Sequence, residues 1–106
     1  MDVTSPVTLE TFARDWASSQ SWDPATAYAV ESRLQAHVYP HLGDLELRAI
    51  RPSTIQRWIR DRSKHLGASY VVLILGHLST ILAAAVEDGL IARNPCGSRA
   101  VRAPQG

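Results

Sequence analysis

The sequence has few of the features that mark disulfide-linked or secreted proteins, or those that bind nucleotide phosphates. Its 106 residues include one cysteine, Cys96, which excludes an internal disulfide and suits a reducing cytoplasm. Its internal glycines are isolated from one another, so there is no glycine-rich phosphate loop. The first residues lack a basic region followed by an apolar run, and we expect no signal peptide. Length and composition predict one soluble, cytoplasmic domain with a single core.

Residues that could perform chemistry are also sparse. His37 and His41 have the i, i+4 spacing of a metal-binding pair, but Pro40 interrupts the helix between them and no third ligand is near in sequence. No serine–histidine–aspartate or cysteine–histidine set is indicated by spacing. We therefore expect no metal, no cofactor and no catalytic residue in this chain.

Formal charge is absent over one long stretch, from Tyr70 to Val86. A membrane-spanning helix is one reading, but a span needs about 20 apolar residues, and this stretch is shorter and has polar residues in its middle. We predict instead the central helix of a soluble bundle, beginning at Ala68 or Ser69 and ended by Gly89. At the helical period its buried face comprises Val71, Ile74, Leu75, Leu78, Leu82, Ala85 and Val86.

Capping residues and apolar periodicity predict three further helices. One spans about 9–19 after Thr8; the next begins at Asp23-Pro24 and stops where Pro40 forces Tyr39 out of helical geometry; the third spans about 52–64 after Pro52. The predicted fold is therefore an all-α bundle of four helices with flexible termini. Its expected divisions are a lead-in at 1–7, a helical domain at 8–96 and a linker at 97–106.

The net charge of +1 conceals a strong asymmetry. Residues 1–46 hold seven acidic and two basic side chains, whereas residues 47–66 hold six basic side chains and one acidic. Arg57, Arg60 and Lys64 fall on one side of the third predicted helix. Such a stripe, with hydroxyls near two helix starts at Thr26 and Ser69, is typical of a surface that binds phosphates. A solvated helix face without a ligand is the alternative.

An ordered series of short motifs spans about residues 8–96 and resembles a known family. The motifs are Thr8-Leu9, Phe12, Trp16, Pro24-x-Thr26, His37-Val-Tyr-Pro40-His-Leu-Gly43, Ile50-Arg-Pro-Ser53, Gly67-Ala-Ser69 and Ala85-Val-Glu-Asp-Gly-Leu-Ile91-x-x-Asn94-Pro-Cys96. The series resembles the N-terminal core-binding domain of phage integrases of the tyrosine recombinase class, which is a SAM-like orthogonal bundle of helices.

The resemblance implies a module that binds double-stranded core-site DNA as half of a clamp, without catalytic residues of its own. The other half would be a C-terminal catalytic domain, absent here, and the isolated domain is expected to be monomeric. In the family the second and fourth helices approach the major groove, which at matching positions implies Thr26, Ala29, Arg33, Ser69, Tyr70 and His77, with Leu73 as a further candidate. A SAM-like domain that binds proteins is the alternative.

One departure concerns the start of the fourth predicted helix. It begins Tyr70-Val-Val-Leu-Ile-Leu, which is more apolar than a groove-reading surface usually is. Specificity then rests on few base contacts, or part of this surface packs against the missing domain.

Overall fold

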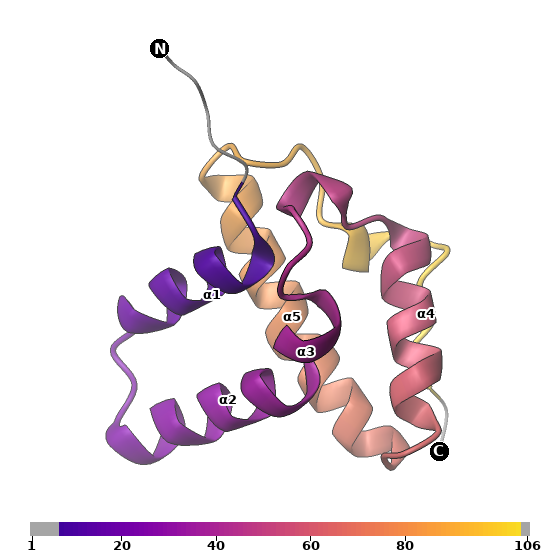
Figure 1. Ribbon diagram of the computed structural model, residues 1–106, viewed down its shortest axis with the longest axis horizontal. Coiled ribbons are helices and arrows are strands. Elements are labelled where there is room, and N and C mark those ends of the chain that lie inside the picture. The colour runs from indigo at the N-terminus through magenta and orange to yellow at the C-terminus, as the bar shows by residue number, and fades with distance from the viewer. Residues whose placement is uncertain (1–6, 105–106) are drawn as a thin grey trace.

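The chain folds into five α-helices and two single-turn 3₁₀ helices (Figure 1), in a computed structural model that describes residues 7–104. The elements are α1 (Leu9–Ser18), α2 (Pro24–His37), α3 (Tyr39–Leu42), η1 (Leu47–Ala49), α4 (Pro52–Ser63), α5 (Ala68–Glu87) and η2 (Pro95–Gly97). The all-α prediction is confirmed. Residues 1–6 of the predicted lead-in at 1–7, and the last two residues of the predicted linker, lie outside the described residues.

The predicted helix starts are confirmed by their caps. Thr8 Oγ1 accepts the N–H of Thr11 at 3.3 Å, and Asp23 Oδ1 accepts the N–H of Thr26 at 2.7 Å, which satisfies amides that have no partner inside the helix. α5 begins at Ala68, one of the two predicted starts, after an extended Gly67 that has no side chain with which to cap it.

The end of α5 is closed by a glycine in the left-handed conformation, as predicted. Gly89 has a φ of +77°, a conformation that costs glycine little. The N–H of Leu90 then reaches Ala85 O at 2.9 Å and that of Gly89 reaches Val86 O at 3.0 Å. These two bonds form a Schellman motif, which turns the chain back toward the core.

The helix α3 corrects one prediction. Tyr39 is its first residue, so the expectation that Pro40 forces Tyr39 out of helical geometry is wrong. Proline is tolerated in the first turn of a helix, where its missing N–H would have no partner. The break falls instead at Val38, whose N–H closes α2 on Leu34 O and whose carbonyl accepts the N–H of Leu42. A fifth, one-turn helix therefore follows α2, where four helices were predicted.

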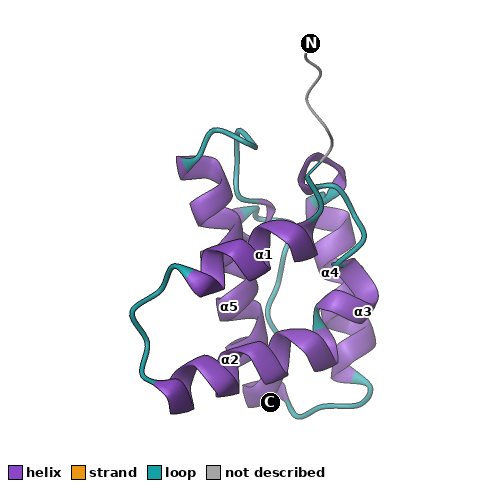
Figure 2. Cartoon of the chain, turned by 60° about the vertical axis from the view of Figure 1, so that its left-hand side comes forward, coloured by secondary structure: helices purple, strands orange, loops and turns teal. Residues whose placement is uncertain are grey.

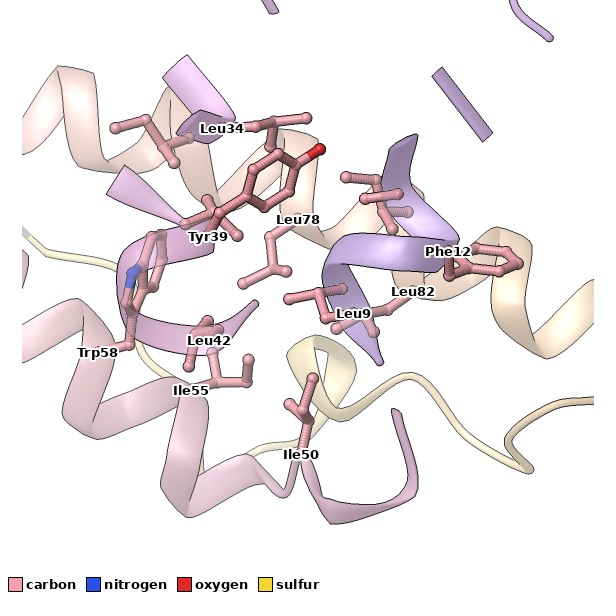
Figure 3. Close-up of a cluster of buried hydrophobic side chains, with 14 of the residues drawn as sticks. Leu9, Phe12, Leu34, Tyr39, Leu42, Ile50, Ile55, Trp58, Leu78 and Leu82 are labelled. Atoms are coloured by element: carbon pink, nitrogen blue, oxygen red, sulfur yellow. The ribbon is translucent and has the colours of Figure 1, made fainter. Parts of the chain in front are cut away.

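The core is organised around α5, which packs against α1, α2, α4 and η2. Six α5 side chains are buried, including Leu78, which lies among labelled side chains of other helices in Figure 3. The core prediction missed Ile81, which is fully buried, and two residues predicted as buried, Leu75 and Val86, are only half-buried. This difference arises because α5 has neighbours on several sides, so its buried surface is not one narrow stripe.

The predicted linker follows α4 over its described part. Val101 packs against the core, and the N–H of Arg102 donates to Gln56 Oε1 at 2.7 Å (Figure 1). The division between a domain at 8–96 and a linker at 97–106 stays a prediction.

Replacing Gly43 with alanine is expected to lower the free energy of unfolding by about 1–3 kcal/mol. Gly43 is buried, and a Cβ there would lie 2.6 Å from Tyr39 O and 2.9 Å from Tyr39 Cα, so the backbone would have to shift. Urea unfolding measures the loss. Gly76→Ala is the control, because a Cβ there meets nothing within 4 Å, and it should stabilise the helix by about 0.5–1 kcal/mol. Equal effects of the two changes would contradict the crowding at Gly43.

Candidate nucleic-acid interface

The site begins where α2 lies against α5 (Figure 2). Arg33 on α2 reaches across to α5, and its Nη1 lies 3.2 Å from His77 Nε2. A guanidinium can only donate, so Nε2 accepts and the ring hydrogen is on Nδ1. Two of the predicted site residues, 44 positions apart in sequence, are therefore in direct contact.

A second set of contacts joins α2, α4 and α5 at the start of α5. The rings of His37 and Tyr70 meet edge to face with centroids 5.6 Å apart. Arg62 Nη1 lies 3.4 Å from His37 Nδ1, and Trp58 Nε1 donates to His37 O at 2.8 Å. His37 is thus held by two α4 residues and one α5 residue. We call Arg33, His37, Arg62, Tyr70 and His77 the crossing cluster.

The positive charge of the crossing cluster comes from its two arginines. Burial lowers the pKa of His37 below its ordinary value, and the positive charges of Arg62 and His41 lower it further. Burial likewise lowers the pKa of His77, with a further contribution from Arg33. Both imidazoles are therefore neutral at neutral pH, as their hydrogen bonds to guanidinium groups require.

The third part of the predicted site lies on α4. Arg57, Arg60 and Lys64 are exposed on the side of α4 opposite its buried residues. No ion pair within residues 7–104 neutralises any of the three. We call them the α4 stripe. No hydrogen bond or ion pair within residues 7–104 links the stripe to Arg33 or His77. That these residues form one binding surface stays a prediction.

Of the remaining predicted residues, Thr26 and Ala29 lie about two turns and one turn before Arg33 on α2, and Ser69 directly precedes Tyr70. Thr26 and Ser69 are exposed and Ala29 is half-buried. Neither Arg62 nor His37 was predicted as a site residue. The signal available for His37 is its spacing from Arg33, because residues four apart lie on the same face of a helix. No comparable signal pointed to Arg62, because its partner is 25 residues away.

The side of α5 that faces away from the core carries no charge over four turns. Val72 and Leu73 are 45% and 40% exposed, which is high for side chains of their kind. We call this side the outer face of α5; its exposed residues are Ser69, Val72, Leu73, Gly76, Thr80 and Ala83.

The composition of α5 also meets the length and hydropathy criteria for a membrane-crossing helix. Its most apolar 18-residue stretch has a mean hydropathy of 1.9, and 33% of that stretch is buried within the protein. The core helix of a soluble protein meets the same criteria, so composition alone is weak evidence for a span. Six α5 residues pack into the core, and this is the role that the fold assigns to the helix.

A groove of about 750 Å³ lies at the far end of α5. Its floor is apolar, with Leu47, Ile50 and Ile91 among the lining residues, and Arg48, Arg51 and Arg93 also line it. Arg48, Arg51 and Arg93 are exposed. Figure 1 shows the loop after α5, which forms one wall, at the end of the helix away from Ala68. Along the α5 axis, at 1.5 Å per residue, the end of the helix beside this groove is about 15 Å from His77 and about 25 Å from Tyr70.

Within residues 7–104, no three or more histidine, cysteine, aspartate or glutamate side chains lie together as a metal site would require. Burial raises the pKa of the Cys96 thiol to about 12. A thiol with that pKa stays protonated and is a poor nucleophile.

The fold and the basic clusters define a small α-helical domain suited to an anionic partner, and the comparisons identify its family. The chain matches the phage integrase central domain over residues 9–100, and it belongs to that family. It is 30% identical over 96 residues to the integrase of Mycobacterium phage L5, an alignment covering 87% of this chain and 24% of that protein. The integrase of Mycobacterium phage D29 is 25% identical over the same length, again with 24% of it covered.

Two solved structures share the fold. The phage integrase SAM-like domain from Moorella thermoacetica has a TM-score of 0.77 and 27% identity, with 100% of this chain and 92% of that one covered. The integrase-like domain from Bacillus cereus has a TM-score of 0.84 and 18% identity, with 100% of this chain and 90% of that one covered. At this identity the similarity is evidence for the fold only. The SAM-like helical fold is therefore confirmed. The chain spans about a quarter of the length of the full phage integrases.

Proposed function

We propose that this chain is the DNA-binding module of a site-specific tyrosine recombinase of the phage integrase kind. It contacts double-stranded core-site DNA as one half of a clamp. A C-terminal catalytic domain of the full-length protein forms the other half and supplies the tyrosine nucleophile. This module therefore binds DNA in the cytoplasm without cutting it, and on its own it is monomeric.

The crossing cluster is the observation that carries the proposal. It holds Arg33 against His77 and Arg62 against His37, whose ring meets Tyr70, which is 36% exposed. The Arg62 side chain is 13% exposed and pairs with Asp61 at 2.9 Å, whereas no ion pair within residues 7–104 neutralises Arg33. Guanidinium groups and the N–H groups at a helix start donate hydrogen bonds to phosphates, and an aromatic ring beside them can contact a base. The α4 stripe adds three exposed cations for the phosphate backbone.

The affinity of the 106-residue chain for duplex DNA is expected to fall steeply with salt. If three to five phosphates are neutralised, log K against log salt should have a slope of about −3 to −4. Arg57→Ala removes one exposed cation from the α4 stripe, so it should flatten that slope by about one unit and weaken binding to every sequence alike. Fluorescence titration of a labelled duplex at several salt concentrations measures both quantities.

Arg57→Lys is the matched control, because it keeps the charge and should leave the slope unchanged. An affinity for duplex DNA that does not change with salt concentration would contradict the proposed DNA-binding function. So would binding that survives replacement of all three residues of the α4 stripe.

A SAM-like protein-interaction domain is the second candidate. The groove lined by Arg48, Arg51 and Arg93 favours it, because an apolar floor with basic residues fits a partner that is both acidic and apolar. Mapping amide signals by NMR separates the two functions. Duplex DNA should shift signals at the crossing cluster and the α4 stripe, and the interaction domain predicts no such shift.

A further inference from the structure

We infer that the outer face of α5 reads thymine methyl groups in the major groove, so that the module prefers A·T pairs where this face lies. The inference rests on the proposed function, because it specifies what one part of the DNA-binding surface recognises. It starts from the exposure of Val72 and Leu73, which no other described element covers.

Gly76 is the second observation. It lies in the middle of a 20-residue helix, where glycine costs about 0.5–1 kcal/mol relative to alanine. A Cβ at this position would meet nothing within 4 Å, so packing inside the protein does not require the glycine. An exposed glycine between Val72 and Thr80 instead leaves room for a partner to approach the α5 backbone closely.

The charges around the outer face favour a polyanion as that partner. The contact between Arg33 and His77 places a guanidinium beside the α5 turn that carries Leu73 and Gly76. Lys64 and His65 are exposed just before the helix begins, and the first acid on α5 is Glu87, at its last residue. A surface with an apolar centre and cations at its margins complements a DNA groove, whose rims carry the phosphates.

The size and chemistry of the outer face of α5 indicate which part of the DNA it would contact. An α-helix with its side chains is about 10–12 Å across, which fits a major groove about 12 Å wide. The side chains at 72, 73, 76 and 83 have no hydrogen-bonding group, and the Thr80 hydroxyl donates to Gly76 O at 2.9 Å. The other hydroxyl of the face, that of Ser69, lies in the first turn of the helix. Among base edges in the major groove, the apolar feature is the C5 methyl of thymine.

The test compares two versions of one A·T-rich duplex, with thymine or with uracil throughout, which differ only in the C5 methyl. Burying one methyl is worth about 0.8 kcal/mol, or about 4-fold in affinity. Uracil should therefore weaken binding about 4-fold if one methyl is contacted and about 15-fold if two are. The readout is the ratio of the two dissociation constants for the 106-residue chain at one salt concentration.

Leu73→Ser tests whether this face is responsible. Leu73 is exposed, so the variant should fold and keep the salt slope of the unaltered chain, but its thymine-to-uracil ratio should move toward one. Gly76→Leu should weaken binding to both duplexes, because the added side chain occupies the space through which DNA would come close to the α5 backbone. A G·C-rich duplex gives the converse test, because 5-methylcytosine carries the same methyl group and should bind more tightly than cytosine.

The outcomes separate the inference from the proposed function. Salt-dependent binding with equal affinity for thymine and uracil duplexes would overturn the methyl readout and leave DNA binding standing. The same holds if the ratio is unchanged in Leu73→Ser. No salt-dependent binding to either duplex would overturn the proposed function itself, and would leave the outer face as a surface for a protein.

Discussion

Replacing Leu78 with alanine is expected to lower the free energy of unfolding by about 2–5 kcal/mol. Leu78 is 0% exposed on α5, and Figure 3 places it between core side chains of other helices, including Tyr39 and Leu9. Truncation removes apolar contacts and leaves a cavity that close-packed neighbours fill only in part. The loss is a large share of the ~5–15 kcal/mol that stabilises a typical domain. Urea unfolding at equilibrium measures it.

Leu73→Ala is the matched control for this prediction. It makes the same chemical change on the same helix, five residues away, at a side chain that is 40% exposed. Its effect should stay within about 0.5 kcal/mol, as is usual for surface positions. Comparable losses at 73 and 78 would show that the core does not lie on the side of α5 described here.

The second large effect is expected for Arg33→Ala in DNA binding. If Arg33 lies in the groove, its loss should weaken binding to the cognate core site by about 1–3 kcal/mol, or about 5- to 150-fold. Binding to a scrambled duplex should weaken less, because phosphate contacts elsewhere are retained. Titration against both duplexes at one salt concentration gives the two ratios.

Arg57→Ala is the comparison for Arg33→Ala, since it removes the same side chain from the α4 stripe. It should lower both affinities equally. Arg33→Lys tests the geometry, because lysine keeps the charge without the planar fork. An Arg33→Ala variant that loses affinity equally on both duplexes would place Arg33 on the phosphate backbone. Unchanged affinity on both would remove it from the interface.

The contacts of Asp61 make it unsuitable as a charge-removal control for DNA binding. Asp61 is not a neutral position at which to vary charge, because it pairs with Arg62, which in turn holds His37. The Arg62 guanidinium lowers the pKa of Asp61 below its usual range, mainly through their hydrogen bond. Asp15, exposed on α1, has no such link among the described residues and serves better.

Local features of this protein were predictable from its sequence because their partners lie within a few residues. The Asp23 cap bonds to Thr26, the Gly89 motif bonds to the last turn of α5, and the apolar period of α5 identifies most of its buried face. The all-α class and the boundaries of the long helices follow from such signals. The helix α3 did not, because four residues that include a proline have no periodic pattern that distinguishes a helix from a turn.

Only the tertiary structure decided which predicted residues meet. Arg33 and His77 are 44 residues apart, and His37 is 25 from Arg62, so these contacts depend on how α2, α4 and α5 pack. The α4 stripe lies on the side of α4 opposite its buried residues, whereas Arg33 contacts α5. Helical periodicity assigns a side chain to a face of its own helix, whereas the neighbour of that face depends on long-range packing.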